Sequence, residues 1–316
     1  IHTVISTKAQ TVTRKFADRY ILLGPDLSHE GVNPEFEEDP ALLKAWRQKL
    51  YNEGVRVRVG RWKIKGEPTA VLVDFSSLIP RKDEILKSLW ESYHVDSISG
   101  QWDYIEPVLF GWAAGVVIAS YVETFGTPTE KAVAHFHEWM TAAGGLYLRK
   151  HAPYIATVFT THATVMGRCI AGNRLPLYND LPKFNADELA RQFNVVAKHS
   201  IEKMAAAYHD AFLTVSDITA NECKYLLGRE PDGVTPNGFE NDFVWAGEEY
   251  YAKRDEARRA MISVAEACLG EKFTGDPLIV GTSGRYEFRN KGIDVFIESL
   301  KQLAASDRLR REVLAY

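Results

Sequence analysis

The segment FTTHATVMGR (159–168) places a histidine directly after an apolar, β-branched run that is typical of a buried strand. A helical pattern follows, and Arg168 lies about one and a half turns beyond His162. Open α/β sheets bind ligands at the carboxyl ends of their strands, so His162 would stand beside a ligand and Arg168 could reach back toward a phosphate. The structural alternative is that His162 satisfies the strand end and Arg168 is a surface charge.

A second strand exit, AHFHEWM (134–140), carries His135 and His137 two residues apart, followed by Glu138. Two such histidines could bind zinc, but no third ligand has supporting spacing, so we predict no metal site. The same side chains could hydrogen-bond a polyhydroxyl substrate, with Glu138 as acceptor and Trp139 as a packing surface. The structural alternative is a helix N-terminus with a glutamate in its favoured first turn.

The segment GTSGRYEFRNKG (281–292) is the strongest candidate for binding an anion. A strand pattern ends at Gly281, a turn containing Gly284 follows, and Arg285 and Lys291 precede a predicted helix. A flexible turn, a forked cation, a point cation and a helix N-terminus together suit a phosphate group. The glycine spacing matches neither a Walker A loop nor the GxGxxG pattern, and cations beside glycines also occur by chance.

The segment REPDGVTPNGFE (229–240) contains two turn sequences, Pro-Asp-Gly and Pro-Asn-Gly, on either side of a short predicted strand at Val234 and Thr235. An Asn-Gly turn at a strand exit can approach a ligand closely, which makes Asn237 a candidate substrate contact. An ordinary turn is the simpler interpretation.

These candidates need a scaffold, and the chain alternates apolar strand-like runs with amphipathic helices. Strands are predicted at 19–25, 55–62, 70–75, 132–136, 155–161, 211–216 and 277–284. Helices are predicted at 41–51, 138–150, 187–209 and 292–304, and Ser216 and Asp217 are placed to cap one more. This alternation favours an α/β fold with parallel sheets of Rossmann-like topology.

The pattern predicts three regions along the chain. Residues 1–240 form a Rossmann-like N-terminal domain, residues 241–270 form a charged helical connector, and residues 271–316 begin a second strand-bearing domain. Both ends fall inside periodic segments, so we expect this sequence to be a piece of a longer protein.

Composition narrows the class of protein. The chain has 316 residues, of which 46% are hydrophobic and 25% charged, which is ordinary for a globular protein with a real core. A net charge of −4 gives no bulk attraction to nucleic acid. The longest apolar stretch, 108–122, is short for a membrane span and is read as a buried helix. Cys169, Cys223 and Cys268 form no metal or pairing pattern, as expected of reduced thiols in the cytosol.

Several segments, taken together and in this order, resemble glycogen synthases of the eukaryotic type, glycosyltransferase family 3, with details closer to bacterial members. The segments are IHTVISTKA, LLGP, VGRW, AHFHEW, FTTHATVMGR, LTVSDITANECKYLLGREPDGVTPNG and GRYEFRNKGIDVFIESL. The resemblance implies a GT-B fold, in which two Rossmann-like domains face a cleft. It implies a cytoplasmic enzyme that moves glucose, with retention, from a nucleotide sugar to the non-reducing 4-hydroxyl of an α-1,4-glucan such as glycogen.

The resemblance also assigns roles to single residues. It implies that His162 contacts the donor glucose, that Arg168 binds donor phosphate, and that Arg285 and Lys291 hold the nucleotide diphosphate. The substrate contacts that complete the expected site are His135, His137, Glu138, Asn237 and Gly284. In this reaction charge builds on the leaving diphosphate, so the chemistry requires cations more than a base. No cofactor, metal, membrane or nucleic-acid partner is expected, and a homo-oligomer is left open.

Three departures from the family pattern bear on activity. The glycine-rich donor loop with its lysine is expected just before Ile1, and two active-site glutamates are expected beyond Tyr316. The chain alone is therefore not expected to be a competent catalyst. The connector reads WAGEEYYAKRDEARR, without the histidines that contact glucose 6-phosphate in animal and fungal members, so activation by this effector is in doubt. UDP-glucose is favoured over ADP-glucose as donor, although base recognition falls mostly outside this chain.

Three alternatives stay open. The first is a non-catalytic module that binds glucan or nucleotide sugar and has lost the second half of the enzyme. The second is a metal-dependent hydrolase that uses His135, His137 and His162. The third is another GT-B enzyme related to starch synthase or sucrose synthase, which fits the FTTHAT and GRYEF segments less well.

Overall fold

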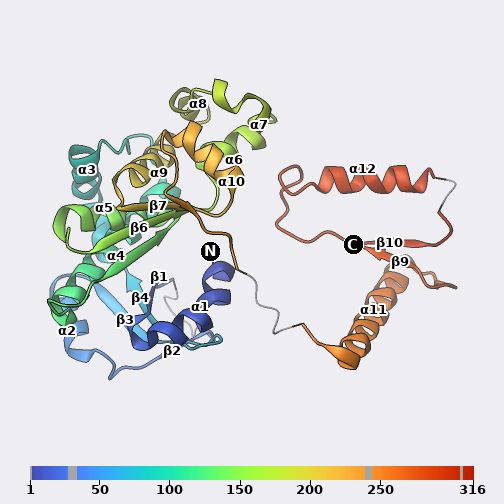
Figure 1. The fold of residues 1–316 in the computed structure, drawn as a ribbon, viewed down its shortest axis with the longest axis horizontal. Coiled ribbons are helices and arrows are strands. Elements are labelled where there is room, and N and C mark those ends of the chain that lie inside the picture. Colours follow the sequence, from blue (N-terminus) through green and yellow to red (C-terminus); the bar gives the residue numbers. More distant parts are fainter. Residues whose placement is uncertain (1, 28–33, 239–243, 307–308) are drawn as a thin grey trace. The chain divides into compact units, whose positions relative to one another are not determined.

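The computed structural model describes residues 2–27, 34–238, 244–306 and 309–316. The chain divides into two compact units, Ile1–Phe239 and Glu240–Tyr316, and each is described here by itself (Figure 1). Among the residues described, the first unit carries two four-stranded sheets and the second a two-stranded sheet.

The first sheet of the larger unit has mixed strand directions. Its strands, in spatial order, are β1 (Ile21–Pro25), β4 (Thr69–Asp74), β3 (Arg56–Trp62) and β2 (Phe36–Glu38). β1 runs parallel to β4, but β3 is antiparallel to both of its neighbours, so this sheet is mixed, unlike the parallel sheets that the strand-helix alternation favours. The reason is the short connection 63–68, because a parallel crossover needs a dozen or more residues.

The second sheet is the predicted parallel one. Its strands, in spatial order, are β5 (Val133–His137), β6 (Ala156–Thr161), β7 (Ala211–Thr214) and β8 (Gly233–Val234), and all three pairings are parallel. The Rossmann-like arrangement is therefore confirmed for this part of the chain. The short strand predicted at Val234 is β8. All four strands end at the same edge of the sheet, and the candidate residues of the larger unit lie at or beyond these strand ends.

Two helices hold the sheets of this unit in one core. α4 (Trp102–Phe125) packs along α5 (Ala142–His151); α4 also contacts β4, and α5 contacts β5 and β6. Glycines allow the close approach, since a Cβ at Gly144 would lie 2.5 Å from the carbonyl oxygen of Gly111. By length and composition α4 could cross a membrane, but its packing inside this core identifies it as a buried helix.

The remaining helices of the larger unit surround the sheets. They are α1 (His2–Phe16), α2 (Lys44–Asn52), α3 (Lys82–Tyr93), α6 (Val165–Gly172), α7 (Leu177–Asp180), α8 (Ala186–Gln192), α9 (Val196–Tyr208) and α10 (Asp217–Glu222). Helices α6, α7, α8 and α10 gather at one end of β6 and β7 (Figure 1). A second apolar cluster there, which includes Met166, Ile170 and Leu181, fixes α6 at the carboxyl edge of the parallel sheet.

The single helix predicted at 187–209 is two helices, α8 and α9. Asn194 lies between them with a φ of +54°, and the N–H of Val195 donates to the carbonyl of Ala190 over 2.9 Å. Asparagine adopts this left-handed conformation more readily than most residues, and the bond satisfies a carbonyl at the end of α8. The break turns the start of α9 toward the second apolar cluster, on which Val196 packs.

The second unit is a small α/β arrangement. Its elements are α11 (Gly247–Leu269), β9 (Leu278–Val280), α12 (Ile293–Ala304) and β10 (Val313–Ala315). β9 pairs in parallel with β10, and α12 lies between them in the chain, as in a βαβ unit. The predicted strand at 277–284 ends earlier, at Val280, and the rest of that segment forms the loop before α12.

Candidate functional site

The carboxyl edge of the parallel sheet brings three predicted histidines together. His137 ends β5, and His162 follows β6 directly. Nδ1 of His137 lies 3.1 Å from Nε2 of His162. The ring of His135, two residues earlier on β5, stacks on His137 with 4.1 Å between ring centroids, and its Nε2 lies 2.7 Å from Oγ1 of Thr160. The spacing of two residues puts both β5 histidines on one face of the strand.

These imidazoles are neutral at neutral pH. A hydrogen bond between two rings requires one nitrogen to donate and the other to accept, so protonation of both rings would set two N–H groups against each other. Burial, with the nearby His135 ring and Lys8, lowers the pKa of His137 to about 2. Burial and Lys8 lower the pKa of His135 to about 4, although part of that side chain is exposed, and burial also lowers the pKa of His162. The histidine cluster therefore offers hydrogen bonds rather than charge.

Glu138 completes this cluster from an unusual backbone conformation. It has φ +69° and ψ 161°, a region that almost only glycine adopts and that costs on the order of 1–3 kcal/mol. Its N–H donates to the carbonyl of Thr160 over 2.9 Å, and its Oε1 accepts from the N–H of His162 over 3.3 Å. Burial raises the pKa of Glu138, while the charge of Arg168 opposes that rise. Glu138 therefore precedes the turn Trp139–Thr141 and faces the His162 segment rather than sitting inside a helix.

The segment after β6 forms the predicted strand-to-helix turn. Oγ1 of Thr164 accepts from the N–H of Gly167 over 2.9 Å, which caps the start of α6. Arg168 follows in the first turn of α6, and its side chain is exposed on the same sheet edge as the histidines. Its charge acts on Glu138, so the structure brings His162, Arg168 and Glu138 into one neighbourhood.

Two buried glutamates beneath this turn escaped the sequence analysis. Oε1 of Glu202, on α9, lies 2.9 Å from Oγ1 of Thr161, and its Oε2 accepts from the N–H of Val165 over 2.8 Å. Glu222 of α10 accepts from Oγ1 of Thr164 over 2.7 Å and from the hydroxyl of Tyr178 over 3.1 Å. These carboxyl groups hold both ends of the turn that carries His162.

The sequence did contain a signal for Glu202. On α9 it shares a face with His199 and Ala206, at the spacing of a buried helical stripe, and all three are at most 2% exposed. A carboxylate on the apolar stripe of a helix requires a buried partner. Lys8 of α1 is a further addition, because this half-buried residue supplies positive charge to the three histidines from a helix that carried no prediction.

Asn237 lies three residues beyond β8 in an exposed segment outside the regular elements. The sheet order puts β8 two strands away from β6, on the same carboxyl edge as His162. The structure thus places Asn237 on the predicted edge, at its far side from the histidine cluster.

The second unit carries the predicted anion loop. Gly292, with φ +68°, precedes the first residue of α12, so Lys291 stands at the helix start as expected. The side chain of Lys291 lies over Gly284, where a Cβ would be 3.9 Å from its Cγ and Cδ. Arg285 forms an ion pair with Glu287 at 3.0 Å, and both cations are exposed. The loop therefore gathers two cations and a glycine within this unit.

No metal cluster accompanies these residues. Within the described ranges, no group of three or more histidine, cysteine, aspartate or glutamate side chains is arranged to hold a metal ion. The ring nitrogens that join His137 and His162 are engaged with each other.

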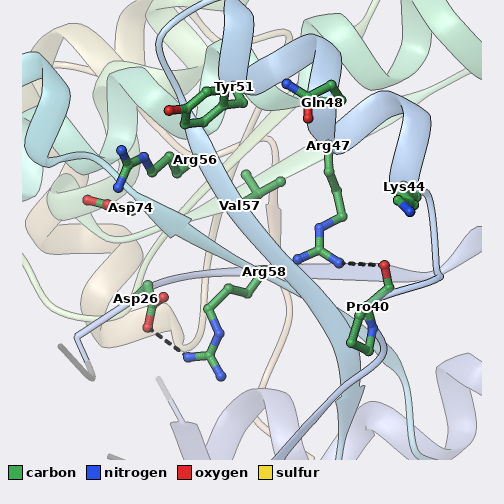
Figure 2. A pocket seen from close by; sticks show the side chains of 10 residues that line it. All are labelled: Asp26, Pro40, Lys44, Arg47, Gln48, Tyr51, Arg56, Val57, Arg58 and Asp74. Atoms are coloured by element: carbon green, nitrogen blue, oxygen red, sulfur yellow. Dashed lines mark hydrogen bonds and ion pairs between the residues drawn. The ribbon is translucent and has the colours of Figure 1, made fainter. Parts of the chain in front are cut away.

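A separate basic groove lies on the mixed sheet (Figure 2). It encloses about 460 Å³ beside α2 and β3, and its lining residues are Asp26, Pro40, Lys44, Arg47, Gln48, Tyr51, Arg56, Val57, Arg58 and Asp74. Glu38 accepts from both Arg47 and Arg58 over 2.7 Å, and the guanidinium of Arg56 lies 5.2 Å from the ring centroid of Tyr51. Of the four cationic side chains that line the groove, those of Arg47 and Arg58 are thus already paired with a carboxylate. The alternating sequence VRVRV (55–59) indicates a basic surface here, because it puts Arg56 and Arg58 on one face of β3.

An all-parallel sheet with hydrogen-bonding and cationic groups at its carboxyl edge defines a Rossmann-like α/β unit of the kind that GT-B glycosyltransferases use. Comparison with known families narrows this class. Residues 1–314 match the family described as Glycogen synthase, and the chain belongs to that family.

Curated relatives agree with this assignment. The chain is similar to proteins named glycogen [starch] synthase from Neurospora crassa (34% identical over 309 residues) and Caenorhabditis elegans (32% over 309 residues), and to the liver protein of that name from Rattus norvegicus (32% over 309 residues). Each match covers 96% of this chain but only 43%, 46% and 44% of the relative, respectively. The chain therefore spans less than half the length of these relatives.

Proposed function

We propose that the protein represented by this chain is a glycogen synthase. It transfers glucose, with retention of configuration, from a nucleotide sugar to the non-reducing end of an α-1,4-glucan, with UDP-glucose as the favoured donor. The observation that carries this proposal is the neutral histidine cluster beside Arg168, on the ligand-binding edge of a chain whose relatives are named for glycogen or starch synthesis.

The first unit supplies contacts suited to a sugar. Glucose presents hydroxyl groups, which need uncharged donors and acceptors at fixed positions, and the neutral rings of His135, His137 and His162 offer both. Glu138 accepts a further hydroxyl proton, and Asn237 offers an amide at the far side of the same edge. His162 orients the donor glucose, and Arg168 faces its phosphate.

The second unit supplies the cations for the leaving group. Arg285 and Lys291 hold the diphosphate of the nucleotide, and Gly284 leaves room for the phosphate to approach the backbone. As the bond from the anomeric carbon to the phosphate oxygen breaks, negative charge builds on the diphosphate and these cations stabilise it. The leaving phosphate then accepts the proton of the attacking glucan hydroxyl, so the reaction requires no side-chain base.

The proposal also covers the compartment of the reaction, its acceptor and its need for cofactors. We place the enzyme in the cytoplasm, in accord with the free thiols of Cys169, Cys223 and Cys268, with glycogen as acceptor and no cofactor or metal. The core position of α4 and the net charge of −4 favour a protein without membrane or nucleic-acid partners.

The test is glucose transfer to glycogen by the full-length protein, with UDP-glucose and ADP-glucose side by side and with or without glucose 6-phosphate. Transfer from either donor supports a synthase and identifies the nucleotide. The comparison with and without glucose 6-phosphate tests whether the connector, which lacks the histidines, still allows activation by this effector. Glycogen binding without transfer from either donor would replace the proposal by a binding module. Stoichiometric zinc in elemental analysis would favour a hydrolase instead.

A further inference from the structure

Glu202 joins the two ends of the turn that carries His162. Its Oε1 lies 2.9 Å from Oγ1 of Thr161, the last residue of β6, and its Oε2 accepts from the N–H of Val165, the first residue of α6, over 2.8 Å. The side chain of Glu202 is 0% exposed. His162 lies between the two bonded positions, so its placement depends on this carboxyl group.

The surroundings of Glu202 disfavour a negative charge. The groups that act on it or titrate beside it are the carboxyls of Glu138 and Glu222, the thiols of Cys169 and Cys223, and, near Cys169, the ammonium of Lys198. Lys198 lies on the same helix and pairs with Asp103. Burial raises the pKa of Glu202 to about 8 and the two carboxyls add to that rise, while the bonds from Val165 and Thr161 oppose it.

The hydrogen bonds around Glu202 can be completed by a neutral acid. Because the N–H of Val165 donates to Oε2, that oxygen is an acceptor and the carboxyl proton belongs on Oε1. Oε1–H then donates to Oγ1 of Thr161, and the Thr161 hydroxyl donates onward to the carbonyl of Ala163, 3.4 Å away. If Glu202 is ionised, the Thr161 hydroxyl must instead donate to Oε1, and the Ala163 carbonyl loses its donor.

We propose that Glu202 is a positioning residue that fixes the His162 turn as a neutral carboxylic acid, through the relay Glu202–Thr161–Ala163. Loss of its proton in alkaline solution loosens the turn beside His162. The catalytic part of this inference, the effect of Glu202 on turnover, rests on the proposed function. The structural part, the effect of Glu202 on the stability of the turn, does not depend on that function.

The structural part is tested by unfolding the 316-residue chain in urea from pH 5 to pH 9. The Glu202→Gln amide keeps both contacts, because its oxygen accepts from Val165 and its NH₂ donates to Thr161. The wild type should lose stability relative to this variant as the pH rises from the ordinary glutamate value of 4.5 toward 8, because the unfolded chain releases the proton first. The ratio of their unfolding constants should change by about tenfold per pH unit in the middle of this window and level off above pH 8.

The matched control is Glu188→Gln, at an exposed position on the neighbouring helix α8, which should change stability by the same small amount at every pH. If the Glu202→Gln chain is less stable to unfolding than wild type at all pH values, the native turn needs the carboxylate, and the proposal is overturned. Parallel stability curves for the two proteins would overturn it equally.

The catalytic part is tested in the full-length protein by the alkaline limb of the pH profile of kcat. The wild type should lose turnover above about pH 8, and Glu202→Gln should retain it, with turnover at pH 7 within about twofold of wild type. The same alkaline loss in both proteins would contradict the positioning role. Absence of glucose transfer by the wild type would refute the proposed function and leave the unfolding comparison intact.

Discussion

His137 and His162 meet across two neighbouring parallel strands, with Nδ1 of the first 3.1 Å from Nε2 of the second. This bond couples the tautomers of the two rings, because one nitrogen must donate and the other accept, and it takes one nitrogen of each ring. The other nitrogen of each ring has no hydrogen bond to the part of the chain that the structure describes, which leaves it for a ligand. Because neither ring is charged at neutral pH, the pair suits hydroxyl groups better than phosphate.

We expect His162→Ala in the full-length protein to lower turnover more than nucleotide affinity. A hydrogen bond that strengthens in the transition state is worth about 10²–10³ in kcat, whereas UDP itself does not reach the sugar position. Transfer assays and calorimetry with UDP measure the two quantities. His94→Asn removes an exposed imidazole at a left-handed position that asparagine tolerates, and serves as the control. Unchanged turnover with weakened UDP binding would contradict the role of His162.

Arg285→Ala should weaken nucleotide binding. A charge-assisted hydrogen bond contributes about 1.5–3 kcal/mol, so the Kd for UDP should rise by about 10- to 150-fold. The control is Arg259→Ala, an exposed arginine of the same unit on α11 that removes the same charge. An equal affinity of the Arg285→Ala protein and this control, measured by calorimetry, would refute the assignment.

Gly167→Ala should destabilise the chain by about 1–3 kcal/mol, because its Cβ would overlap the Glu222 carboxylate and crowd Oγ1 of Thr164. Gly172→Ala is the matched control in the same helix, where a Cβ meets nothing within 4 Å. That control should be neutral or stabilising by about 0.5–1 kcal/mol. Urea unfolding of both variants distinguishes them, and similar midpoints would show that Glu222 does not need its close approach to α6.

Because the ring of His209 is buried, we expect the folded chain to lose stability in acid. Nδ1 of its ring donates to the carbonyl of Ala205 over 2.8 Å, while Nε2 is buried against Gly145 without a partner in the described chain. Burial lowers the pKa of His209 to about 4, so the unfolded chain takes up the proton first. Stability that is present above the ordinary value of 6.5 is therefore lost as the pH falls toward 4, by about 1.4 kcal/mol per pH unit.

Comparison with His209→Asn measures that loss. Asparagine keeps a donor toward Ala205 and removes the titrating nitrogen, so the variant is less stable but should show a shallower acid slope between pH 6.5 and 4. The opposite slope that Glu202 contributes is common to both proteins and cancels in the difference. Identical slopes would mean that the ring of His209 finds a partner when it is protonated.

The predictions made from the sequence were most accurate where the local pattern of residues determines the structure. The short apolar runs at β5, β6 and β7 form strands as predicted, and Ser216 caps α10 through the N–H of Thr219 as expected. Local patterns also brought His135, His137 and His162 to one edge, because parallel strands end on the same side of a sheet.

Elsewhere the outcome depended on partners far away in the chain. The helical pattern at 187–209 is continuous, and the packing of Val196 on the second apolar cluster, which the pattern does not reveal, favours the break at Asn194. The sequence places Glu202 on a buried helical stripe but does not identify its partner Thr161, and nothing in the sequence indicates that Glu222 bonds to Thr164. The supporting layer of a site therefore escapes sequence analysis more easily than the groups that touch a ligand.

The shortness of β8 has a consequence for how the molecule behaves in concentrated solution. An outer strand with open backbone groups is a template on which another chain can add a strand and start a fibril. β8 consists of Gly233 and Val234 alone, and Pro231 and the ion pair between Arg229 and Asp232 precede it. The parallel sheet thus offers almost no continuous backbone at this border, so intermolecular strand addition is discouraged on the side that also bears Asn237.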